Sequence, residues 1–411
     1  LANLQLKISG GANLLTASQT LTTSDHVTWV LGNLAGLTDP THRLVTFTLA
    51  LSSAGVTDAA GNALAGGAST SFVVLDPALA LQGQTLTFTG TPGNDTFVYK
   101  AGGTAQVTLN GVSYLVDPTL ASTASFVGNG GSDTVTLMAP AGGGNSLSLS
   151  PGGGTLSGPG YTVRLSAVSQ VVAVGGPADR AYFTGSAGAD VFVGTPTYAY
   201  LYGAGYFNQE DGFGVALAVG AGGSDRAYLY DGPGDDVFVG TPAYAYLYGS
   251  GFFNQANGFP VVIGYSTAGG TDRAYLYDSP GNDVFAGTPT YAYLYGSGFF
   301  NQANGFKVVS AYSTAGGSDT AYLYDSPGND VFVATSAYSY LYGSGFFNQA
   351  NGFAAVYAYS TGGSDAAYLM GTGTAADTFV DGGAYAYLYG NAFFALENGF
   401  GSLTVNPAAH R

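Results

Sequence analysis

The residues with the widest chemical range in this sequence are carboxylates, and they recur in Gly-rich turns. Asp278 and Asp283 lie on one such turn, DSPGND, and the same six residues recur at 325–330. Paired carboxylates can serve acid–base catalysis, but an active site is seldom copied along a chain. No His-centred triad repeats with the turns, because the three histidines lie outside the repeated region, at His26, His42 and His410. We therefore predict no enzyme activity.

A period of 46 or 47 residues organises most of the chain. Equivalent aspartates are spaced by 46, 47, 47 and 46 residues, at Asp179, Asp225, Asp272, Asp319 and Asp365. Such a period indicates an array in which each unit packs on the next. Degenerate copies start at Gln84 and Asp133, so we expect seven units of 46–49 residues with about two coils each. The expected regions are 84–178 (degenerate units), 179–364 (regular units) and 365–411 (C-terminal capping unit and tail).

The composition favours an all-β fold. The 411 residues include 66 Gly and only 8% charged residues, and no run has the 3.6-residue apolar spacing of a helix. A net charge of −16 disfavours nucleic-acid binding, because no basic stripe neutralises phosphates. The absence of Cys excludes disulfides. The sequence has no transmembrane run and no signal peptide, and its start on Leu1 without Met indicates a processed or excised segment.

Residues 1–76 lack the repeat. Alternation in LQLKISG, VTWVLGNL and VTFTLAL predicts antiparallel strands, and GVTDAAGNALAGG predicts a turn before a last strand. This region resembles bacterial Ig-like modules, whose final hairpin has a similar pattern, here at Asp58, Gly61, Asn62 and Leu64. The resemblance implies a β-sandwich that is either cut or short of its first strands, with an open edge. A connector, 77–83, follows.

One regular unit contains a shorter repetition. AYLYD at Ala274 recurs as AYLYG at Ala292, eighteen residues later, and 29 residues then separate Ala292 from the next AYLYD at Ala321. The second interval is longer than the first by eleven residues, which is the length of GSGFFNQANGF, 296–306. We expect two eighteen-residue coils per unit, the second with an outward loop. Two coils of about 23 residues, as in a wider three-sided β-helix, are the alternative. Both predict a parallel β-solenoid of about fourteen coils and roughly 65–70 Å.

Strand alternation assigns two faces to the segment TYAYLYG, 290–296. Tyr291, Tyr293 and Tyr295 share one face, and Ala292 and Leu294 share the other. A two-sheet solenoid is thin, so we expect Ala and Leu inside and Tyr outside, in ladders that run through Tyr246, Tyr293 and their equivalents. Soluble monomers rarely expose large apolar patches, so something should cover this surface. The predicted assembly or binding face comprises Tyr200, Tyr202, Tyr246, Tyr248, Tyr293, Tyr295, Tyr340 and Tyr342.

The turns GTPGND (90–95), GNGGSD (128–133) and DSPGND (278–283) resemble half of the nonapeptide of RTX, haemolysin-type calcium β-rolls. In that family, turns on adjacent coils hold Ca²⁺ between them. The resemblance implies calcium ligands at Asp95, Asp133, Asp236, Asp283 and Asp330. The back-to-back copies of the motif are missing here. We therefore favour the alternative that Gly, Pro, Asn and Asp only form the turns.

The segment FFNQANGF, 299–306, carries amides that recur in register. The predicted loop ladder comprises Asn254, Asn301 and Asn348. One interpretation is a binding groove. The favoured interpretation is an internal hydrogen-bonded stack that holds the repeats in register.

The whole sequence resembles bacterial cell-surface repeat proteins that combine Ig-like modules with GND-type β-solenoid repeats. We expect an extracellular structural protein, a rigid rod that self-associates into a bacterial surface fibre, sheath or layer. The first alternative is an adhesin or carbohydrate-binding rod that presents its Tyr face to surface glycans. The second is a polysaccharide-active β-helix enzyme, for which Arg226 and Arg273 are the only regularly placed bases. No nucleic-acid partner and no membrane span are expected.

Overall fold

The computed structural model of the chain describes residues 1–8, 11–38, 44–76, 79–372 and 377–406. Among these residues every regular element is a β-strand, so the expected all-β class is confirmed. His42 and His410 lie outside the described residues. The chain divides into two compact units: unit 1 comprises Leu1–Asn145 and Gly152–Val174, and unit 2 comprises Ser146–Pro151 and Gly175–Arg411. Parallel β-solenoid coils occur in both, about nine turns in all, compared with the fourteen expected.

Unit 1 begins with a small antiparallel arrangement. Strands β1 (Leu4–Ile8), β4 (Phe47–Leu51) and β5 (Ala68–Phe72) form a sheet in the order β1-β4-β5. Strands β2 (Thr20–Thr22) and β3 (Val30–Gly32) form a separate two-stranded ladder. Leu6, Val45 and Phe47 are the buried residues of this core. These strands do not establish an Ig-like sandwich, which stays a prediction.

The first solenoid coils complete unit 1. Strand β11 pairs parallel with β7 and β15, and β12 pairs parallel with β8 and β16. Antiparallel neighbours also occur, as in β8–β9–β10. The strands are β6 (Leu79–Gln82), β7 (Thr85–Thr89), β8 (Thr96–Lys100), β9 (Ala105–Leu109), β10 (Val112–Val116), β11 (Thr123–Val127), β12 (Thr134–Met138), β14 (Gly153–Gly158), β15 (Tyr161–Ser166) and β16 (Gln170–Val174).

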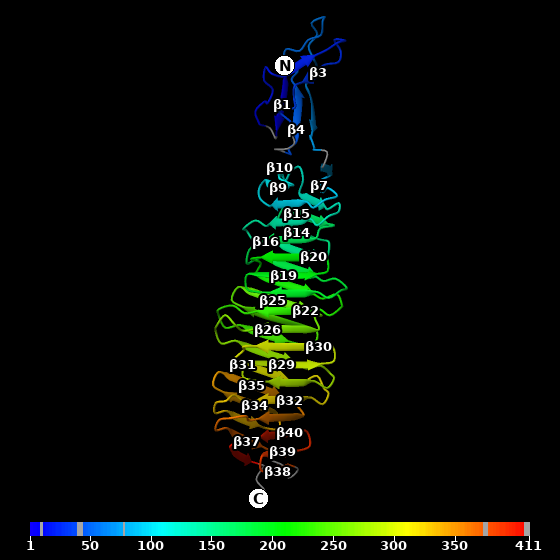
Figure 1. The fold of residues 1–411 in the computed structure, drawn as a ribbon. Helices are drawn as coiled ribbons and strands as arrows, with labels where there is room; N and C mark the ends of the chain where they lie inside the picture. Colours follow the sequence, from blue (N-terminus) through cyan, green and yellow to red (C-terminus); the bar gives the residue numbers. More distant parts are fainter. Residues whose placement is uncertain (9–10, 39–43, 77–78, 373–376, 407–411) are drawn as a thin grey trace. The chain divides into compact units, whose positions relative to one another are not determined.

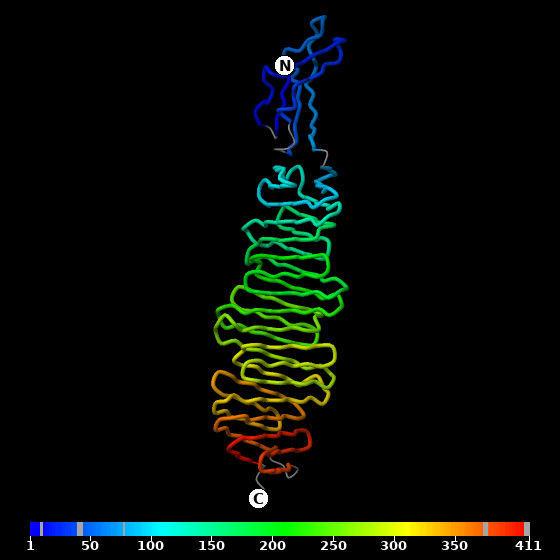
Figure 2. Tube along the Cα trace, viewed as in Figure 1, coloured from blue at the N-terminus to red at the C-terminus, as the bar shows by residue number. Residues whose placement is uncertain are grey.

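Unit 2 contains two long sheets of stacked strands (Figures 1 and 2). Sheet I comprises β18 (Val191–Gly194), β19 (Tyr198–Gly203), β20 (Tyr206–Asp211), β22 (Arg226–Tyr230), β26 (Val261–Tyr265), β28 (Val284–Gly287), β29 (Tyr291–Gly296), β30 (Phe299–Asn304), β32 (Thr320–Tyr324), β36 (Ala355–Tyr359), β38 (Thr378–Asp381), β39 (Tyr385–Tyr389) and β40 (Phe394–Asn398). Sheet II comprises β13 (Ser146–Ser150), β17 (Arg180–Thr184), β21 (Val215–Val219), β23 (Val237–Gly240), β24 (Tyr244–Gly249), β25 (Phe252–Asn257), β27 (Arg273–Tyr277), β31 (Val308–Tyr312), β33 (Val331–Ala334), β34 (Tyr338–Gly343), β35 (Phe346–Asn351), β37 (Ala366–Met370) and β41 (Ser402–Asn406).

In each regular repeat the chain contributes strands to one sheet, then to the other sheet, and then to the first sheet again. The strands β28–β30 form an antiparallel meander in sheet I, β31 lies in sheet II, and β32 returns to sheet I. Strand β30 pairs parallel with the earlier strand β26, and β28 pairs parallel with the later strand β32. The chain therefore enters the meander at the edge farther from β26, and each following strand of the meander lies closer to β26. Three passes place the next meander, β33–β35, in sheet II. A repeat therefore makes one and a half turns, and the expectation of two coils per repeat is wrong.

The outward loop expected at 296–306 is a sheet strand instead. Residues Phe299–Asn304 are β30, joined to β29 by the two-residue connection Ser297–Gly298. Gly298 has φ +84°, a conformation that L-residues disfavour and that suits a tight hairpin. The preceding connection is held by Thr288, whose hydroxyl donates to the Tyr291 carbonyl at 2.8 Å. Residues with the alternation of a strand thus continue the sheet rather than leave it.

The core lies between the two sheets and consists of the inward residues of each strand. In β29, Ala292 and Leu294 are fully buried, whereas Tyr291 and Tyr295 are each 41% exposed. This alternation agrees with the expected face assignment. The expected core residues are also fully buried: Leu229, Leu276, Leu323, Phe238, Phe285 and Phe332.

Candidate functional site

The carboxylates singled out by the sequence form three structural classes. Turn-closing aspartates directly precede a sheet strand, as Asp283 precedes β28; turn-opening aspartates begin the same turns, as Asp278 does. Staple aspartates lie about 36 residues after the turn-closing ones. Of the predicted calcium ligands, Asp133 is a staple aspartate and the other four are turn-closing.

A staple aspartate accepts a hydrogen bond from the backbone N–H of its turn-closing partner at five places along the solenoid. The N···Oδ1 distances are 2.7–2.9 Å, for the pairs Asp95–Asp133, Asp190–Asp225, Asp236–Asp272, Asp283–Asp319 and Asp330–Asp365. All ten side chains are buried. A charge-assisted bond to a buried backbone donor is among the stronger hydrogen bonds. Each staple therefore ties one coil to the next.

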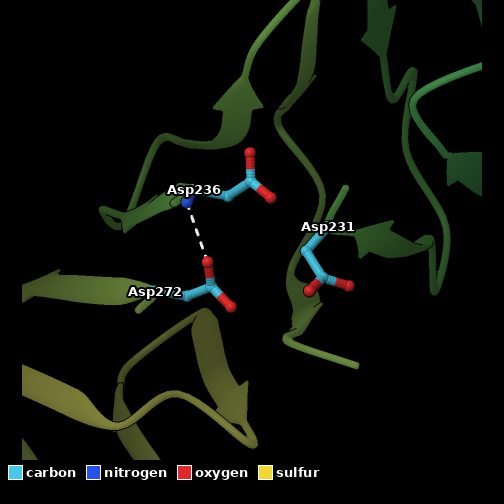
Figure 3. Close-up of side chains that lie close together, drawn as sticks. All are labelled: Asp231, Asp236 and Asp272. Atoms are coloured by element: carbon cyan, nitrogen blue, oxygen red, sulfur yellow. Dashed lines mark hydrogen bonds between the residues drawn. The ribbon is translucent and has the colours of Figure 1, made fainter. Parts of the chain in front are cut away.

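The three classes meet in three buried clusters. In each cluster, ligand atoms of the three carboxylates lie within 4.8 Å of one another. Figure 3 shows one cluster, in which the carboxylates of Asp231, Asp236 and Asp272 surround a common space. The other two comprise Asp278, Asp283 and Asp319, and Asp325, Asp330 and Asp365.

Hydrogen bonds account for nearly all of the oxygens in the cluster of Figure 3. Asp231 accepts from the backbone N–H groups of Thr267 and Ala268, each at 2.9 Å. Asp236 Oδ2 accepts from Gly232 N at 2.8 Å, and Asp272 accepts from Asp236 N and the Ser266 hydroxyl. Only Asp236 Oδ1 lacks a partner.

These donors decide how well the clusters fit calcium. A Ca²⁺ site needs six to eight oxygen ligands, whereas this cluster offers six carboxylate oxygens, five of which already accept hydrogen bonds. The unpartnered Asp236 Oδ1 lies against Gly249, where a Cβ would be 1.4 Å away, and beside the Phe252 ring. The arrangement fits hydrogen-bonded turns better than a calcium shell, and the calcium ligands stay a prediction.

Four buried carboxylate oxygens lack any hydrogen-bond partner among the described residues: Asp133 Oδ2, Asp225 Oδ2, Asp236 Oδ1 and Asp330 Oδ1. Sister repeats show which donor is missing. Asp190 Oδ1 accepts from the hydroxyls of Tyr206 at 2.7 Å and Ser186 at 3.0 Å. Beside Asp236 both hydroxyls are missing, because Phe252 and Gly232 stand in their places. Beside Asp330 the Tyr is replaced by Phe346, and the Ser326 hydroxyl donates to Oδ2 instead. Asp272 Oδ2 accepts from Ser266, whereas Gly220 stands in that place beside Asp225. The unpaired oxygens thus mark positions where a repeat has lost a hydroxyl.

Burial shifts the titration of several of these carboxyls. Desolvation raises the pKa of Asp225, Asp236 and Asp283 above the usual range, against the opposing effect of the backbone N–H donors. The largest case is Glu210, an inward residue of β20. Desolvation raises its pKa to about 8, although Phe213 N donates to its Oε2 at 3.0 Å.

The predicted Tyr face is exposed in part and differs in its layout. Four of its residues are exposed and four are half-buried: exposed are Tyr202, Tyr248, Tyr295 and Tyr342, and half-buried are Tyr200, Tyr246, Tyr293 and Tyr340. Consecutive equivalents alternate between sheets, with Tyr200 and Tyr293 in sheet I and Tyr246 and Tyr340 in sheet II. The single ladder expected through these residues is therefore wrong. In each meander, three Tyr of one strand lie side by side, as Tyr291 and Tyr293 do with ring centroids 6.2 Å apart.

Sequence reasoning missed the cross-strand Tyr pairs. Tyr230 stacks on Tyr265 with ring centroids 4.8 Å apart and planes 9° apart, and Tyr277 stacks on Tyr312 at 5.1 Å and 14°. These pairs join parallel neighbours, β22 with β26 and β27 with β31, which are about 35 residues apart in the sequence. Sequence reasoning also missed that FFNQAN is a sheet strand, although a Gly-Ser-Gly between two alternating runs is a hairpin pattern.

The Asn ladder is an internal feature. Asn254, Asn301 and Asn348 are 2–3% exposed, and their side-chain amides donate to the carbonyls of Thr195, Thr241 and Thr288 at 2.8–2.9 Å. Each bond spans about 60 residues and joins a meander to the turn of the preceding repeat. This geometry agrees with a role in register and leaves these amides buried, away from any surface groove.

Comparison with models of known protein families and with curated proteins gave no match. A search of the described residues for a helix long and apolar enough to cross a membrane found none.

Proposed function

We propose that this chain is an extracellular structural protein whose solenoid acts as a rigid rod in a bacterial surface fibre, sheath or layer. A β-solenoid repeat fold is consistent with such a role. The aspartate staples and the Asn amide bonds connect neighbouring coils at buried positions. Both kinds of bond resist bending or separation of coils, which suits a load-bearing element.

The observation that carries the proposal is the exposed Tyr surface of unit 2. Thirteen tyrosines of this unit are exposed on the outer faces of its sheets: Tyr182, Tyr198, Tyr202, Tyr244, Tyr248, Tyr277, Tyr291, Tyr295, Tyr324, Tyr338, Tyr342, Tyr385 and Tyr389. Soluble monomers rarely carry so extended an aromatic surface without a partner. Tyr is also enriched in protein interfaces, because it buries much area at low entropic cost. Contact between copies of the chain would cover this surface.

The ring geometry supports assembly over glycan capture by the same surface. A sugar ring stacks on an exposed aromatic face. Along the meander strands, near-parallel rings lie side by side, as Tyr291 and Tyr293 do at 6.2 Å and 9°, and Tyr277 and Tyr324 also stack on a cross-strand partner. Stacking covers one face of each such ring, which leaves less ring face for a sugar.

The proposal includes no catalytic role. The carboxylates that would be needed are buried and already accept hydrogen bonds from backbone N–H and hydroxyl groups. The basic residue Arg273 has its side chain at the outer face of β27, on the opposite side of that strand from the buried Asp clusters.

An adhesive role is the second candidate, and one observation in unit 1 favours it. A cleft of about 680 Å³ is lined by Leu21, His26, Trp29 and Asp58, among others. Trp29, the only Trp of the chain, is 55% exposed there. An exposed Trp beside polar groups is a common feature of ligand sites.

Electron microscopy and sedimentation velocity on the purified full chain test the proposal. Wild type should form assemblies that grow with protein concentration. The triple variant Tyr248→Thr, Tyr295→Thr and Tyr342→Thr removes three of the exposed rings. It should keep its far-UV circular dichroism but assemble less, because Thr keeps β-propensity and removes aromatic area. A wild-type chain that stays monomeric while binding immobilised glycans through Trp29 would overturn the structural role in favour of the adhesive one.

A further inference from the structure

The two outer faces of unit 2 present the same surface. Tyr291 and Tyr295 on sheet I are each 41% exposed, and their equivalents on sheet II, Tyr244 and Tyr248, are 42% and 41% exposed. The next equivalents on sheet II, Tyr338 and Tyr342, are again 42% and 41% exposed. The faces therefore match in residue type and in accessibility.

This match follows from the one-and-a-half-turn repeat. Each repeat contributes five strands, so a step of one repeat turns the chain by half a turn and advances it by two and a half strands, about 12 Å at ~4.8 Å per strand. Such a step is a local two-fold screw operation. A repeat of two whole turns would instead have placed all of the Tyr meanders on one face and left the other face different.

Few charges lie on the two outer faces. The meander strands YAYLYG and FFNQAN carry no charged residue, although β20 ends in Asp211, and Arg226 and Arg273 are exposed at the starts of β22 and β27. Among the described residues 16 acidic side chains are buried, including the three clusters of aspartates. All of them except Glu210 and Glu397 lie in the turns at the strand ends rather than on the outer faces.

The area of one face is sufficient for a stable contact. Sheets I and II each have thirteen strands in unit 2. At about 4.8 Å per strand and roughly 17 Å per five-residue strand, one face covers on the order of 1,000 Å². A stable protein–protein contact buries about 800 Å² per partner. A second copy of the same face meets this requirement.

We propose that both sheet faces are equivalent contact surfaces for a second copy of this chain, so that association is open-ended. A copy bound to sheet I leaves an identical surface on sheet II, and growth continues through stacking rather than ending at a closed dimer. This inference rests on the proposed self-association and adds its geometry. It identifies the partner as the chain itself and the growth direction as perpendicular to the sheets.

Face-specific variants test the inference on the full chain. The sheet I variant carries Tyr198→Thr, Tyr202→Thr, Tyr291→Thr and Tyr295→Thr; the sheet II variant carries Tyr244→Thr, Tyr248→Thr, Tyr338→Thr and Tyr342→Thr. A matched control replaces four exposed turn residues off both faces: Ala187→Ser, Ala221→Ser, Ala268→Ser and Ala315→Ser.

Light scattering coupled to gel filtration measures the mass of each variant and of wild type across a concentration series. Thermal melts check folding, and the pairs Tyr291→Thr/Tyr295→Thr and Tyr244→Thr/Tyr248→Thr replace any quadruple variant that fails to fold.

Wild type and the turn control should form species whose mass rises without limit with concentration. Each single-face variant should stop at twice the monomer mass, because its one intact face pairs with the same face of another copy. The combined eight-residue variant should be monomeric. If one single-face variant is monomeric while the other still polymerises, the faces are not equivalent and the inference fails, although self-association stands. If wild type is monomeric at every concentration, the proposed assembly itself fails.

Discussion

Asp190 and Asp236 close equivalent turns in consecutive repeats, but only Asp190 has both carboxylate oxygens hydrogen-bonded. The Tyr206 hydroxyl reaches Asp190 Oδ1 at 2.7 Å, while Phe252 faces Asp236 and leaves its Oδ1 unpartnered. Elsewhere the two turns share the same staple bond, at 2.8 Å in each. The staple bonds from backbone N–H groups are therefore common to both repeats and define the fold, whereas the side-chain hydroxyls that donate to the aspartates set the local stability of each repeat. In a repeat array such differences add nearly independently.

Loss of a staple should have the largest effect. Asp319→Ala deprives Asp283 N and the Ser313 hydroxyl of their acceptor, and two buried donors without partners should cost about 3–4 kcal/mol of unfolding free energy. Asp225→Ala removes the acceptor of Asp190 N and no hydroxyl bond, so it should cost about half as much, roughly 1.5–2 kcal/mol. Urea denaturation with local hydrogen exchange measures both. Asp319→Asn keeps one acceptor oxygen and serves as the control. Equal losses in the two Ala variants would show that the Ser hydroxyls contribute nothing.

Exchange of the aromatic residue should shift the stability of each repeat. Tyr206→Phe removes one of two hydroxyl donors to Asp190 Oδ1, which still accepts from the Ser186 hydroxyl at 3.0 Å, so the change should cost about 0.5–1.5 kcal/mol. Phe252→Tyr supplies the missing donor to Asp236 and should stabilise the protein by about 0.5–1.5 kcal/mol.

The control for this exchange is Phe299→Tyr, because Asp283 Oδ1 already accepts from the Ser279 hydroxyl at 3.0 Å. Its gain, read from the denaturation midpoint, should be smaller than that of Phe252→Tyr. A Phe252→Tyr protein no more stable than wild type would contradict the assignment of the missing hydroxyl.

Parity and composition were enough to predict the sheets and their faces. Tyr293 and Leu294 must point to opposite sides of a strand, and only Leu fits a thin core. The path of the chain could not be deduced in the same way. Phe299–Asn304 alternates like a strand but follows a Gly-rich turn, so its length fits an outward loop as well as a hairpin. Asp283 and its staple aspartate, Asp319, are 36 residues apart, and no sequence pattern indicates that residues so far apart share a hydrogen bond.

The buried Glu210 should make stability depend on pH. Its folded pKa, about 8, lies above the ordinary 4.5, so the unfolded state loses its proton first as pH rises. The contribution of this group is fully present below pH 4.5 and is lost as pH rises through about 8. Between pH 5 and 8 wild type should therefore lose about 1 kcal/mol or more relative to Glu210→Gln. Denaturation midpoints across this range provide the measurement, and parallel curves for the two proteins would contradict the raised pKa of Glu210.

Chelation should have the smallest effect. Five of the six carboxylate oxygens in the cluster of Asp231, Asp236 and Asp272 already accept hydrogen bonds. Addition of EDTA should leave the melting temperature within about 1 °C, because a ligand stabilises a protein only where it binds the folded state. A rise of several degrees on adding CaCl₂, abolished by Asp236→Asn, would instead identify the cluster as a calcium site.

The most direct test of the half-turn repeat is a distance between spin labels. The chain has no Cys, so cysteine pairs at positions 244 and 291, and at 244 and 338, can be labelled without background. Strands β24 and β34 lie five strands apart in sheet II, which predicts about 24 Å for the pair 244 and 338. Positions 244 and 291 lie on opposite faces, so their labels should be more than about 20 Å apart. A distance near 10 Å for that pair would place consecutive repeats on one face and contradict the account.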